Sequence, residues 1–595
     1  MRILSTLLTV CVMVGLVSPL HADQDKADAK KSLTVAHLKL TGSMPEKPPT
    51  VDPLLGQLGE TFQTKLDRLK KARTDKEVQA VLLEIDGLTI GWGKLNELSQ
   101  AIAAIRAAGK KVFAHIESGA SKDYLLALAC DDICIPEAGW LMLTGIRAEA
   151  TFYKDLFDKI GVKADFLQMG DFKAAAEPYT RNSLSQANRE QMTAMLDDFY
   201  ENEIVARICK ARKLDANRVR ELIDAGPYTA RAAVKAGLID RTGYFSGYEA
   251  TLEKLLGVPS VKIEKDYGKK KDEELDIFGL YRKLLFGPIR STTSRAPKVA
   301  VIYATGAIVT GKSSNGLLMG ESVGSETLVK AIREAEEDKT VKAIVLRVDS
   351  PGGSALASDL IWHELKRCKK PVVASMGDVA ASGGYYISMG ASKVFAEPGT
   401  ITGSIGVIGG KLATRPMFDK IGIKTEVIAR GQNSGLLTSG DVFSPSEKKV
   451  FQTLMEDIYD QFLNKTLENR QAAGQKLTFD DLKKLAGGRV WTGRQAKARG
   501  LVDELGTLPD AIAAAAKMGG LPADKEPELL QLPKSKNSLD SLLDQVFGLK
   551  ATGLESQVVG KLPVEVLDKL RGVDVLLELR REPVWALLPF RLEVR

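Results

Sequence analysis

Two stretches of this chain repeat each other at a nearly constant distance along the sequence. The run DKEVQAVLLEID that begins at Asp75 aligns with DKTVKAIVLRVD, which begins at Asp338, 263 residues later. Farther along, FDKIGVK at residues 157–163 matches FDKIGIK at residues 418–424. A long internal repeat of this kind predicts that one supersecondary pattern is built twice.

Each copy alternates short apolar runs with helical patterns. Residues 343–348 form a near-continuous apolar run, which is typical of a strand buried on both faces. Residues 358–369 then have the spacing of an amphipathic helix, and residues 371–375 have the pattern of the next strand. The succession of strand, helix and strand predicts parallel βαβ units and an α/β fold in two tandem domains.

The chain has 595 residues, too many for one hydrophobic core, so several domains are expected. The repeat boundaries and the composition between them predict a signal or anchor at 1–22, a first repeat at 32–265, a linker at 266–295, a second repeat at 296–517 and a tail at 518–595.

The first residues have the character of a targeting segment. A short basic start at Arg2 is followed by a mostly apolar run over residues 3–17, and Ala22 is a small residue suited to a cleavage site. Two interpretations remain open: a cleaved signal peptide, or a short uncleaved anchor near the lower length limit for a membrane span. Either one directs the rest of the chain out of the cytoplasm.

Composition excludes several function classes. With 44% hydrophobic and 27% charged residues, the chain is an ordinary globular protein, neither disordered nor fibrous. The net charge of +7 is small for this length and argues against a nucleic-acid partner. None of the five cysteines has the spacing to histidine that a metal site requires.

Two glycine-rich motifs follow consecutive strands of the second copy. They are DSPGGS at residues 349–354 and AASGGYY at residues 380–386. Glycines between a strand and a helix expose backbone N–H groups, which suits an oxyanion hole, and Ser382 is presented among small residues. Each motif alone also fits a tight turn; the pair in consecutive βα units points to a catalytic site.

These motifs, together with TGSIGV at 402–407 and GDFKAAAEPY at 170–179, resemble the signal peptide peptidase A (protease IV) family in its long, two-repeat form. The resemblance covers about residues 32–517. It implies two tandem domains of the Clp-protease/crotonase-like α/β superfold and serine peptidase activity through a Ser/Lys dyad and an acyl-enzyme.

The resemblance also assigns roles to single residues. Ser382 corresponds to the nucleophile and Lys173 to the general base. Gly353 and Gly383 would supply the oxyanion N–H groups, and Ser404 would orient the lysine amine. The resemblance implies no metal and no organic cofactor.

The residue types are consistent with this assignment. A serine hydroxyl needs a base to become a nucleophile. His37 and His115 lie in strand-like runs and His363 in a helical one, so none belongs to a motif that builds a Ser/His/Asp triad. A lysine can act as the base when burial lowers its pKa, and Lys173 is flanked by Phe172 and three alanines.

The repeat predicts one composite site. In the repeat alignment Lys173 corresponds to Ser434, and Ser382 corresponds to Lys122 or a residue next to it. Each copy therefore holds one member of the dyad. Whether the two members meet within one chain or between neighbouring subunits is left open.

The resemblance implies substrates and a location as well. The family cleaves signal peptides and other short apolar peptides, which would bind as an extended strand. We expect membrane association, a homo-oligomer such as a tetrameric ring, and a place in the bacterial cell envelope. That place is the periplasmic face of the inner membrane, or the periplasm if the signal is cleaved.

Two other functions fit parts of the sequence. A ring-forming scaffold without activity would explain the fold, but not the presence of Ser382, Lys173 and the glycine motifs together. An acyl-CoA enzyme of the crotonase type would share the oxyanion geometry, but an export signal argues against it. The apolar end of the tail is expected to pack on the body or on a neighbouring subunit.

Overall fold

The computed structural model describes residues 32–46, 60–117, 119–269, 294–316, 320–534 and 584–587. The predicted signal or anchor at residues 1–22 lies outside these ranges, as does most of the predicted linker. Within the described ranges, no helix combines the length and the apolar character that a membrane span requires.

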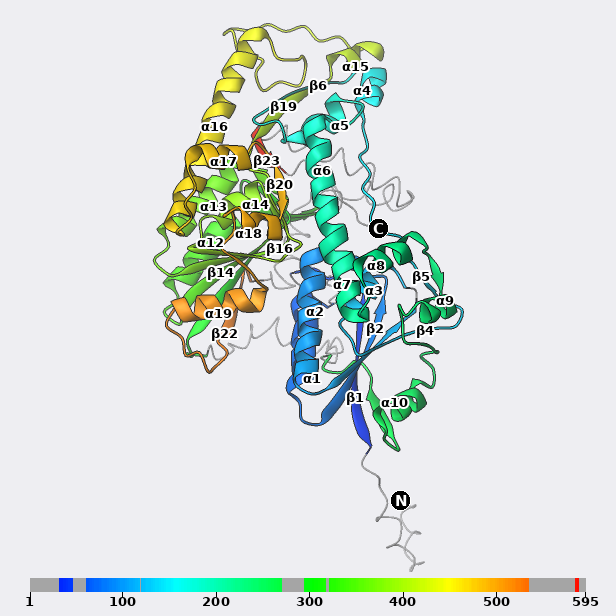
Figure 1. Cartoon of the computed structure of the whole chain (residues 1–595). Coiled ribbons are helices and arrows are strands. Elements are labelled where there is room, and N and C mark those ends of the chain that lie inside the picture. Colours follow the sequence, from blue (N-terminus) through cyan, green and yellow to red (C-terminus); the bar gives the residue numbers. More distant parts are fainter. Residues whose placement is uncertain are drawn as a thin grey trace, which may run out of the picture.

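The first half forms a six-stranded parallel sheet in the order β8-β4-β3-β2-β1-β9 (Figure 1). Its strands are β1 Leu33–Thr41, β2 Val78–Asp86, β3 Lys111–Ile116, β4 Asp132–Ile135, β8 Arg241–Thr242 and β9 Val261–Glu264. The central strands are apolar on both faces because helices cover both sides. These helices are α1 Phe62–Thr74, α2 Trp92–Ala107, α3 Ser121–Ala127 and α9 Ala230–Lys235 on one face, with α10 Tyr248–Leu256 on the other.

The second half repeats this plan with an eight-stranded sheet. Its main path runs β20-β18-β16-β14-β10-β22, and β17 and β21 extend from β16. The strands are β10 Lys298–Thr305, β14 Val341–Ser350, β16 Val372–Ala381, β17 Lys393–Ala396, β18 Ile401–Gly403, β20 Val490–Thr492, β21 Glu504–Leu505 and β22 Glu528–Leu532. Its helices are α12 Ser325–Glu337, α13 Ala355–Arg367, α14 Gly383–Ser388, α16 Pro445–Ala472, α17 Phe479–Leu485 and α18 Gly493–Ala498, with α19 Leu508–Met518 on the opposite face.

The registers of the two sheets correspond. Val35 is paired with Ala80 in the first half, and Val299 is paired with Ala343 in the second, each just after a register shift. At the sheet edge, β9 lies parallel to β1 as β22 lies parallel to β10. The predicted α/β fold with two tandem repeats is confirmed, and β22 adds a strand from residues beyond the predicted repeat end at 517.

A third sheet joins the two halves, in the order β12-β13-β11-β15-β23-β19-β6. Its strands are β6 Lys163–Gln168, β11 Ala307–Val309, β12 Ser314–Gly316, β13 Gly320–Gly324, β15 Gly352–Ser354, β19 Ile408–Ala413 and β23 Val584–Leu587. First-half strand β6 pairs antiparallel with second-half strand β19 along its whole length. This pairing draws the segment that follows β6 into the second half.

The remaining elements surround that junction or cover the first half (Figure 1). They are α4 Lys154–Ile160, the 3₁₀ helix η1 Ala174–Ala176, α5 Glu177–Thr180, α6 Gln186–Asp198, the π-helical turn η2 Phe199–Val205, α7 Ala206–Arg212, α8 Ala216–Asp224, α15 Arg415–Lys420 and the small sheet of β5 Trp140–Leu141 with β7 Tyr228–Thr229.

Candidate active site

Ser382 occupies the sharp turn between β16 and α14. Its backbone has φ 56° and ψ −113°, a conformation that a residue with a side chain rarely adopts. The turn is held by hydrogen bonds on both sides: the N–H of Ser382 donates to the carbonyl of Gly403, and the N–H of Tyr386 donates to the carbonyl of Ser382. The second half therefore holds this hydroxyl in one strained, fully buried position.

Lys173 reaches this serine from the first half. It lies in the short segment between β6 and η1, which the pairing of β6 with β19 brings across the junction. Its Nζ lies 2.6 Å from the Oγ of Ser382, and both side chains are fully buried. The two predicted dyad residues thus meet within one chain, although 209 residues separate them in sequence.

Ser404 contacts the same amine twice. The Nζ of Lys173 donates to the carbonyl oxygen of Ser404 at 3.0 Å and to its Oγ at 2.9 Å. A neutral amine has two N–H groups and one lone pair. Two donated bonds to Ser404 therefore leave the lone pair for the hydroxyl of Ser382.

The surroundings favour that neutral form. Burial holds the pKa of Lys173 well below its ordinary value of 10.5. Removal of a charged amine from water is costly when no opposite charge compensates for it, and burial is the one cause of this shift. The site therefore contains a lysine able to accept a proton.

Two consecutive glycines of the second half form the floor under Lys173. At Gly488, which has φ +82°, an added Cβ would lie 2.5 Å from both the Cβ and the N of Lys173. A Cβ added at Gly170 would lie 2.3 Å from the backbone of Gly487, and the N–H of Phe172 donates to the carbonyl of Gly487. The sequence analysis missed this turn, whose only signal is the pair of adjacent glycines at 487–488.

The two predicted oxyanion glycines lie together beside the serine. Gly383 is the first residue of α14, and a Cβ on it would be 3.1 Å from the backbone N of Gly353. At Gly353 itself, with φ +157°, a Cβ would be 2.0 Å from the carbonyl oxygen of Ile308. Only glycine fits this close approach of β15 to β11.

Comparison with known proteins agrees with this geometry. The profile of Peptidase family S49 matches residues 104–259 and 364–521, one segment in each half and together more than half of the chain. The chain belongs to peptidase family S49. It is a serine protease of this family, and the Clp protease profile also matches residues 318–402.

Named relatives cover most of this S49 peptidase. Serine protease SPPA, chloroplastic, of Arabidopsis thaliana is 34% identical over 85% of the chain and 72% of its own length. Protease 4 of Salmonella typhi is 30% identical over 90% of the chain and 86% of its own length. Protease 4 of Haemophilus influenzae is 30% identical over 84% of the chain and 80% of its own length.

The histidines of the described ranges have other partners. His37 lies 3.1 Å from Glu84, and the Nε2 of His115 lies 3.2 Å from the carbonyl oxygen of Gly243. Both rings are buried in the first half, and His363 is exposed on α13. In the described part of this S49 peptidase, these three histidines therefore lie in strands and a helix away from the hydrogen bonds of Ser382.

Equivalent tyrosines fix the repeat alignment near the serine. The hydroxyl of Tyr124 donates to Leu238, and that of Tyr385 donates to Leu501, each at 2.9 Å. This register sets Ser121 opposite the nucleophile position, one residue before the predicted Lys122. The hydroxyl of Ser121 donates to the carbonyl of Met142 instead of meeting an amine.

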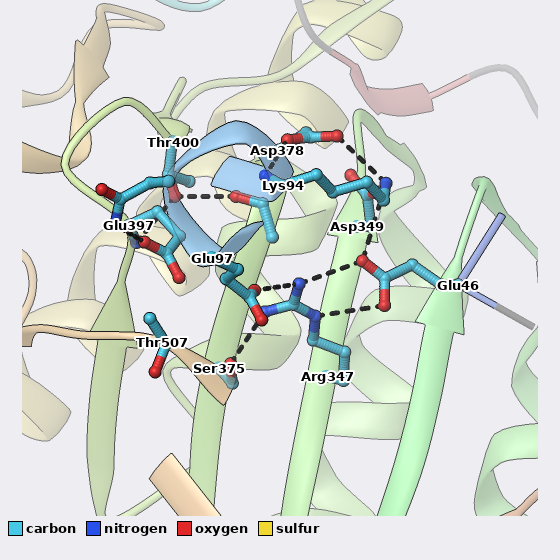
Figure 2. Close-up of polar contacts among 12 residues, drawn as sticks. Glu46, Lys94, Glu97, Arg347, Asp349, Ser375, Asp378, Glu397, Thr400 and Thr507 are labelled. Carbon is cyan, nitrogen blue, oxygen red and sulfur yellow. Dashed lines mark hydrogen bonds and ion pairs between the residues drawn. The ribbon is translucent and has the colours of Figure 1, made fainter. Parts of the chain in front are cut away.

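Beneath the site, Lys94 of α2 connects the two strands that lead into the glycine motifs. Its Nζ lies 2.7 Å from Asp349, four residues before Gly353, and 3.0 Å from Asp378, four residues before Ser382 (Figure 2). The backbone N–H of Lys94 also donates to Asp378. Helix α2 of the first half therefore holds the ends of β14 and β16 at a fixed separation.

A second buried network of ion pairs, centred on Arg347, lies beside that of Lys94. Arg347 donates to Glu46 at 3.0 Å and to Glu97 at 2.6 Å, and both acids belong to the first half (Figure 2). Burial together with the neighbouring Glu97 raises the pKa of Glu397 well above its ordinary value. The sequence analysis missed this network because its members are scattered over both halves.

Proposed function

We propose that this S49 peptidase cleaves short apolar peptides with a dyad of Ser382 and Lys173. The observation that supports the proposal most strongly is the 2.6 Å separation of amine and hydroxyl, both fully buried. Because both groups are buried away from water, the amine of Lys173 and the hydroxyl of Ser382 exchange the proton directly with each other.

In the first step, neutral Lys173 takes the proton of the Ser382 hydroxyl as Oγ attacks the peptide carbonyl. The tetrahedral oxyanion that forms accepts hydrogen bonds from the N–H groups of Gly353 and Gly383. The protonated lysine then gives its proton to the leaving amine as the peptide C–N bond breaks. The product of this half-reaction is an acyl-enzyme on Ser382 and a free amino terminus.

In the second step, water replaces the departed amine. Lys173 takes a proton from the water as its oxygen attacks the ester, and the proton passes to Oγ of Ser382 when the acyl group leaves as a carboxylic acid. Ser404 fixes the direction of the lysine lone pair during both steps, because its carbonyl and hydroxyl hold the other two positions on Nζ.

We assign the chain to the bacterial cell envelope, at the periplasmic face of the inner membrane or free in the periplasm. The targeting character of residues 1–22 supports this location, whichever way that segment is processed. Signal peptides left by protein export and other apolar peptides are the substrates such a location offers.

We also propose a homo-oligomer. Apolar side chains are exposed on α4 and on α15 with the loop that follows it, and Lys420 of α15 donates to the carbonyl of Lys159 in α4. We call this surface the α4–α15 patch; its members are Leu156, Ile160, Phe418, Ile421, Ile423, Val427 and Ile428. A patch of this kind is typical of a subunit interface.

The test of the catalytic proposal is hydrolysis of an apolar fluorogenic peptide by protein produced without residues 1–22. We expect Ser382→Ala and Lys173→Ala to lose activity while retaining fold and assembly, measured by circular dichroism and size-exclusion chromatography. Loss in Ser382→Ala alone would require another base. Full activity in Ser382→Ala would refute the site, and an inactive wild type would favour the scaffold.

A further inference from the structure

The main chain directly before Lys173 is held at both of its polar groups. The N–H of Phe172 donates to the carbonyl of Gly487 at 3.0 Å, and the carbonyl of Phe172 accepts from the side-chain Nε2 of Gln191 at 3.1 Å. These two bonds fix the point at which the chain enters Lys173. The place of the lysine in its pocket therefore depends on what holds Gln191.

Gln191 lies on α6 and is only 1% exposed. Besides its bond to Phe172, its Nε2 donates to the Oδ1 of Asn188 at 3.0 Å, and its Oε1 accepts from the backbone N–H of Val490 at 3.1 Å. A backbone carbonyl can only accept and a backbone N–H can only donate, so these partners allow the amide a single orientation. A buried amide with all these bonds made is a rigid connector.

The second-half partner of this amide leads to the nucleophile. Val490 belongs to β20 and lies opposite Gly403 of β18. The carbonyl of Gly403 accepts from the N–H of Ser382 at 2.8 Å, and the N–H of Ser404 donates to the carbonyl of Arg489 at 2.7 Å. One amide therefore joins the segment that carries the lysine to the strand that supports the serine turn.

The chain after the lysine is tied to the same helix. Glu177, four residues beyond Lys173, accepts from the Nδ2 of Asn188 at 3.0 Å and from the N–H of Ser185 at 3.1 Å. Asn188 and Gln191 are three residues apart and lie on one face of α6, which runs beside β20 (Figure 1). The first turns of α6 thus hold the lysine segment at both of its ends.

We propose that Gln191 is a positioning residue for the dyad: its amide fixes the main chain of Phe172 against β20, and so sets where the amine of Lys173 lies relative to Ser382. This inference rests on the proposed function and adds to it a residue that touches no reacting atom. A misplacement of about 1 Å can cost about 100-fold in rate, so a single connector at this point is sufficient to matter.

The experiment compares Gln191→Met with the matched control Gln495→Met. Gln495 of α18 makes the same kind of connection between α6 and β20, because its Oε1 accepts from the N–H of Thr492 and its Nε2 donates to the carbonyl of Ala194, each at 3.2 Å. It does not touch the lysine segment. Methionine preserves the length of either side chain and removes its hydrogen bonds.

We expect Gln191→Met to lower kcat for an apolar fluorogenic peptide about ten-fold with KM unchanged. This loss is smaller than the roughly 100-fold cost of a full misplacement, because Phe172 keeps its bond to Gly487. Gln495→Met should retain the wild-type kcat. Both variants lose bonds between the same two elements, so their melting temperatures should fall by similar small amounts.

A pH profile adds a readout that a merely structural role would not change. When the lysine segment loosens, water reaches the amine more easily, and the pKa of Lys173, which burial holds low, should move toward its ordinary value. The pH at which kcat/KM levels off should therefore be higher in Gln191→Met than in wild type. In Gln495→Met it should stay where wild type has it.

A measurement without catalysis separates this inference from the dyad assignment. In the Ser382→Ala background, backbone hydrogen exchange of the peptide covering residues 170–176 should be about ten-fold faster with Gln191→Met, as expected for one lost hydrogen bond. Gln495→Met should leave that exchange unchanged. If exchange changes in this way while Lys173→Ala remains active, the dyad fails but the placement of the lysine segment by Gln191 stands.

Three outcomes would overturn the inference. The first is unchanged exchange of residues 170–176 in Gln191→Met. The second is an equal loss of kcat in Gln191→Met and Gln495→Met. The third is a loss in Gln191→Met that only follows the fraction of unfolded protein, with the pH profile of the remaining activity the same as in wild type, because the glutamine would then be a structural residue.

Discussion

Lys173 depends on its surroundings more than any other residue of the site. An exposed lysine is protonated at neutral pH and cannot act as a base, whereas burial holds the pKa of this one well below 10.5. The side chain is fixed by Ser404 on one side and by the glycine turn below. Its proposed role as a base therefore depends on packing, and substitutions in that packing should affect its pKa and position.

The first prediction concerns pH. Because the protonated amine cannot accept a proton, kcat/KM for the fluorogenic peptide should rise with pH as Lys173 loses its charge. The rate should then level off well below pH 10.5, where an ordinary lysine titrates. The measurement is a pH profile from 5 to 10 with the folded state checked at each point; a rate that is still rising steeply at pH 10 would contradict the prediction.

The second prediction concerns the floor of the pocket. Gly488→Ala should lower kcat about 100-fold. The new Cβ would push Lys173 away, and a shift of about 1 Å is enough to misalign its amine with the hydroxyl of Ser382. Gly487→Ala is the matched control: its φ of +66° is also positive, but a Cβ added there would be 3.8 Å from its nearest neighbour, the Cα of Gly170. Equal activity in the two variants would contradict the prediction, because any loss of kcat would then come from backbone strain and not from contact with Lys173.

At the scale of elements, the strand that leads to the nucleophile shows what sequence could and could not predict. Its start near 371 was predicted from the apolar run, but β16 continues to Ala381. Gly377 and Asp378 have the character of a turn. The strand continues through them because Lys94 and the N–H of Gly91, both from the other half, bind Asp378.

Other helices and strands also divide into those that the sequence predicted and those that it did not. Repetition and strand-like apolar runs predicted the two parallel sheets, because these signals are local. The residues that meet at Ser382 were predicted from the family resemblance. Helix α13 begins at Ala355, three residues before the predicted start, since the side chain of Ser354 caps it. The third sheet was not predicted, because β6, β19 and β23 are short strands paired only through distant contacts.

The third prediction concerns Lys94. Lys94→Met should destabilise the protein by about 3 kcal/mol, because it leaves Asp349 and Asp378 buried without their cation. The control is Lys70→Met, which removes an exposed ion pair with Glu526 across the same two halves and should cost about 1 kcal/mol or less. Urea unfolding measures both; equal losses would contradict the prediction.

The fourth prediction concerns Glu397, whose pKa lies well above 4.5 in the folded protein. Above pH 4.5 the unfolded chain gives up this proton while the folded chain keeps it, so stability falls as pH rises toward the folded pKa. Glu397→Gln cannot ionise. Its melting temperature should exceed that of wild type at pH 8, and the difference should vanish below pH 4; a constant difference would contradict the assignment.

At the scale of the whole molecule, one site is shared between two similar halves. Lys173 is buried in the junction, whereas its repeat equivalent Ser434 is exposed in a turn of the second half. Among the described residues the proposed dyad therefore forms once, and it forms only while β6 is paired with β19. Duplication supplied the fold twice, but the chemistry depends on contacts between the copies.

The fifth prediction concerns assembly through the α4–α15 patch. Ile428, 87% exposed, and Ile423 are replaced together by Asp, and light scattering with size-exclusion chromatography should then give a lower mass than wild type. Met518→Asp, at the end of α19 and remote from the patch, serves as the control (Figure 1). An unchanged mass in the double variant would place the interface elsewhere.

The most direct measurement of the central claim is covalent labelling of the serine with a fluorophosphonate, followed by intact mass and peptide mapping. We predict one adduct on wild type, located at Ser382, and none on Ser382→Ala. Labelling of Lys173→Ala should be slower by about 1,000-fold, the usual contribution of a general base. An adduct on another serine, or equal labelling rates with and without Lys173, would contradict the account.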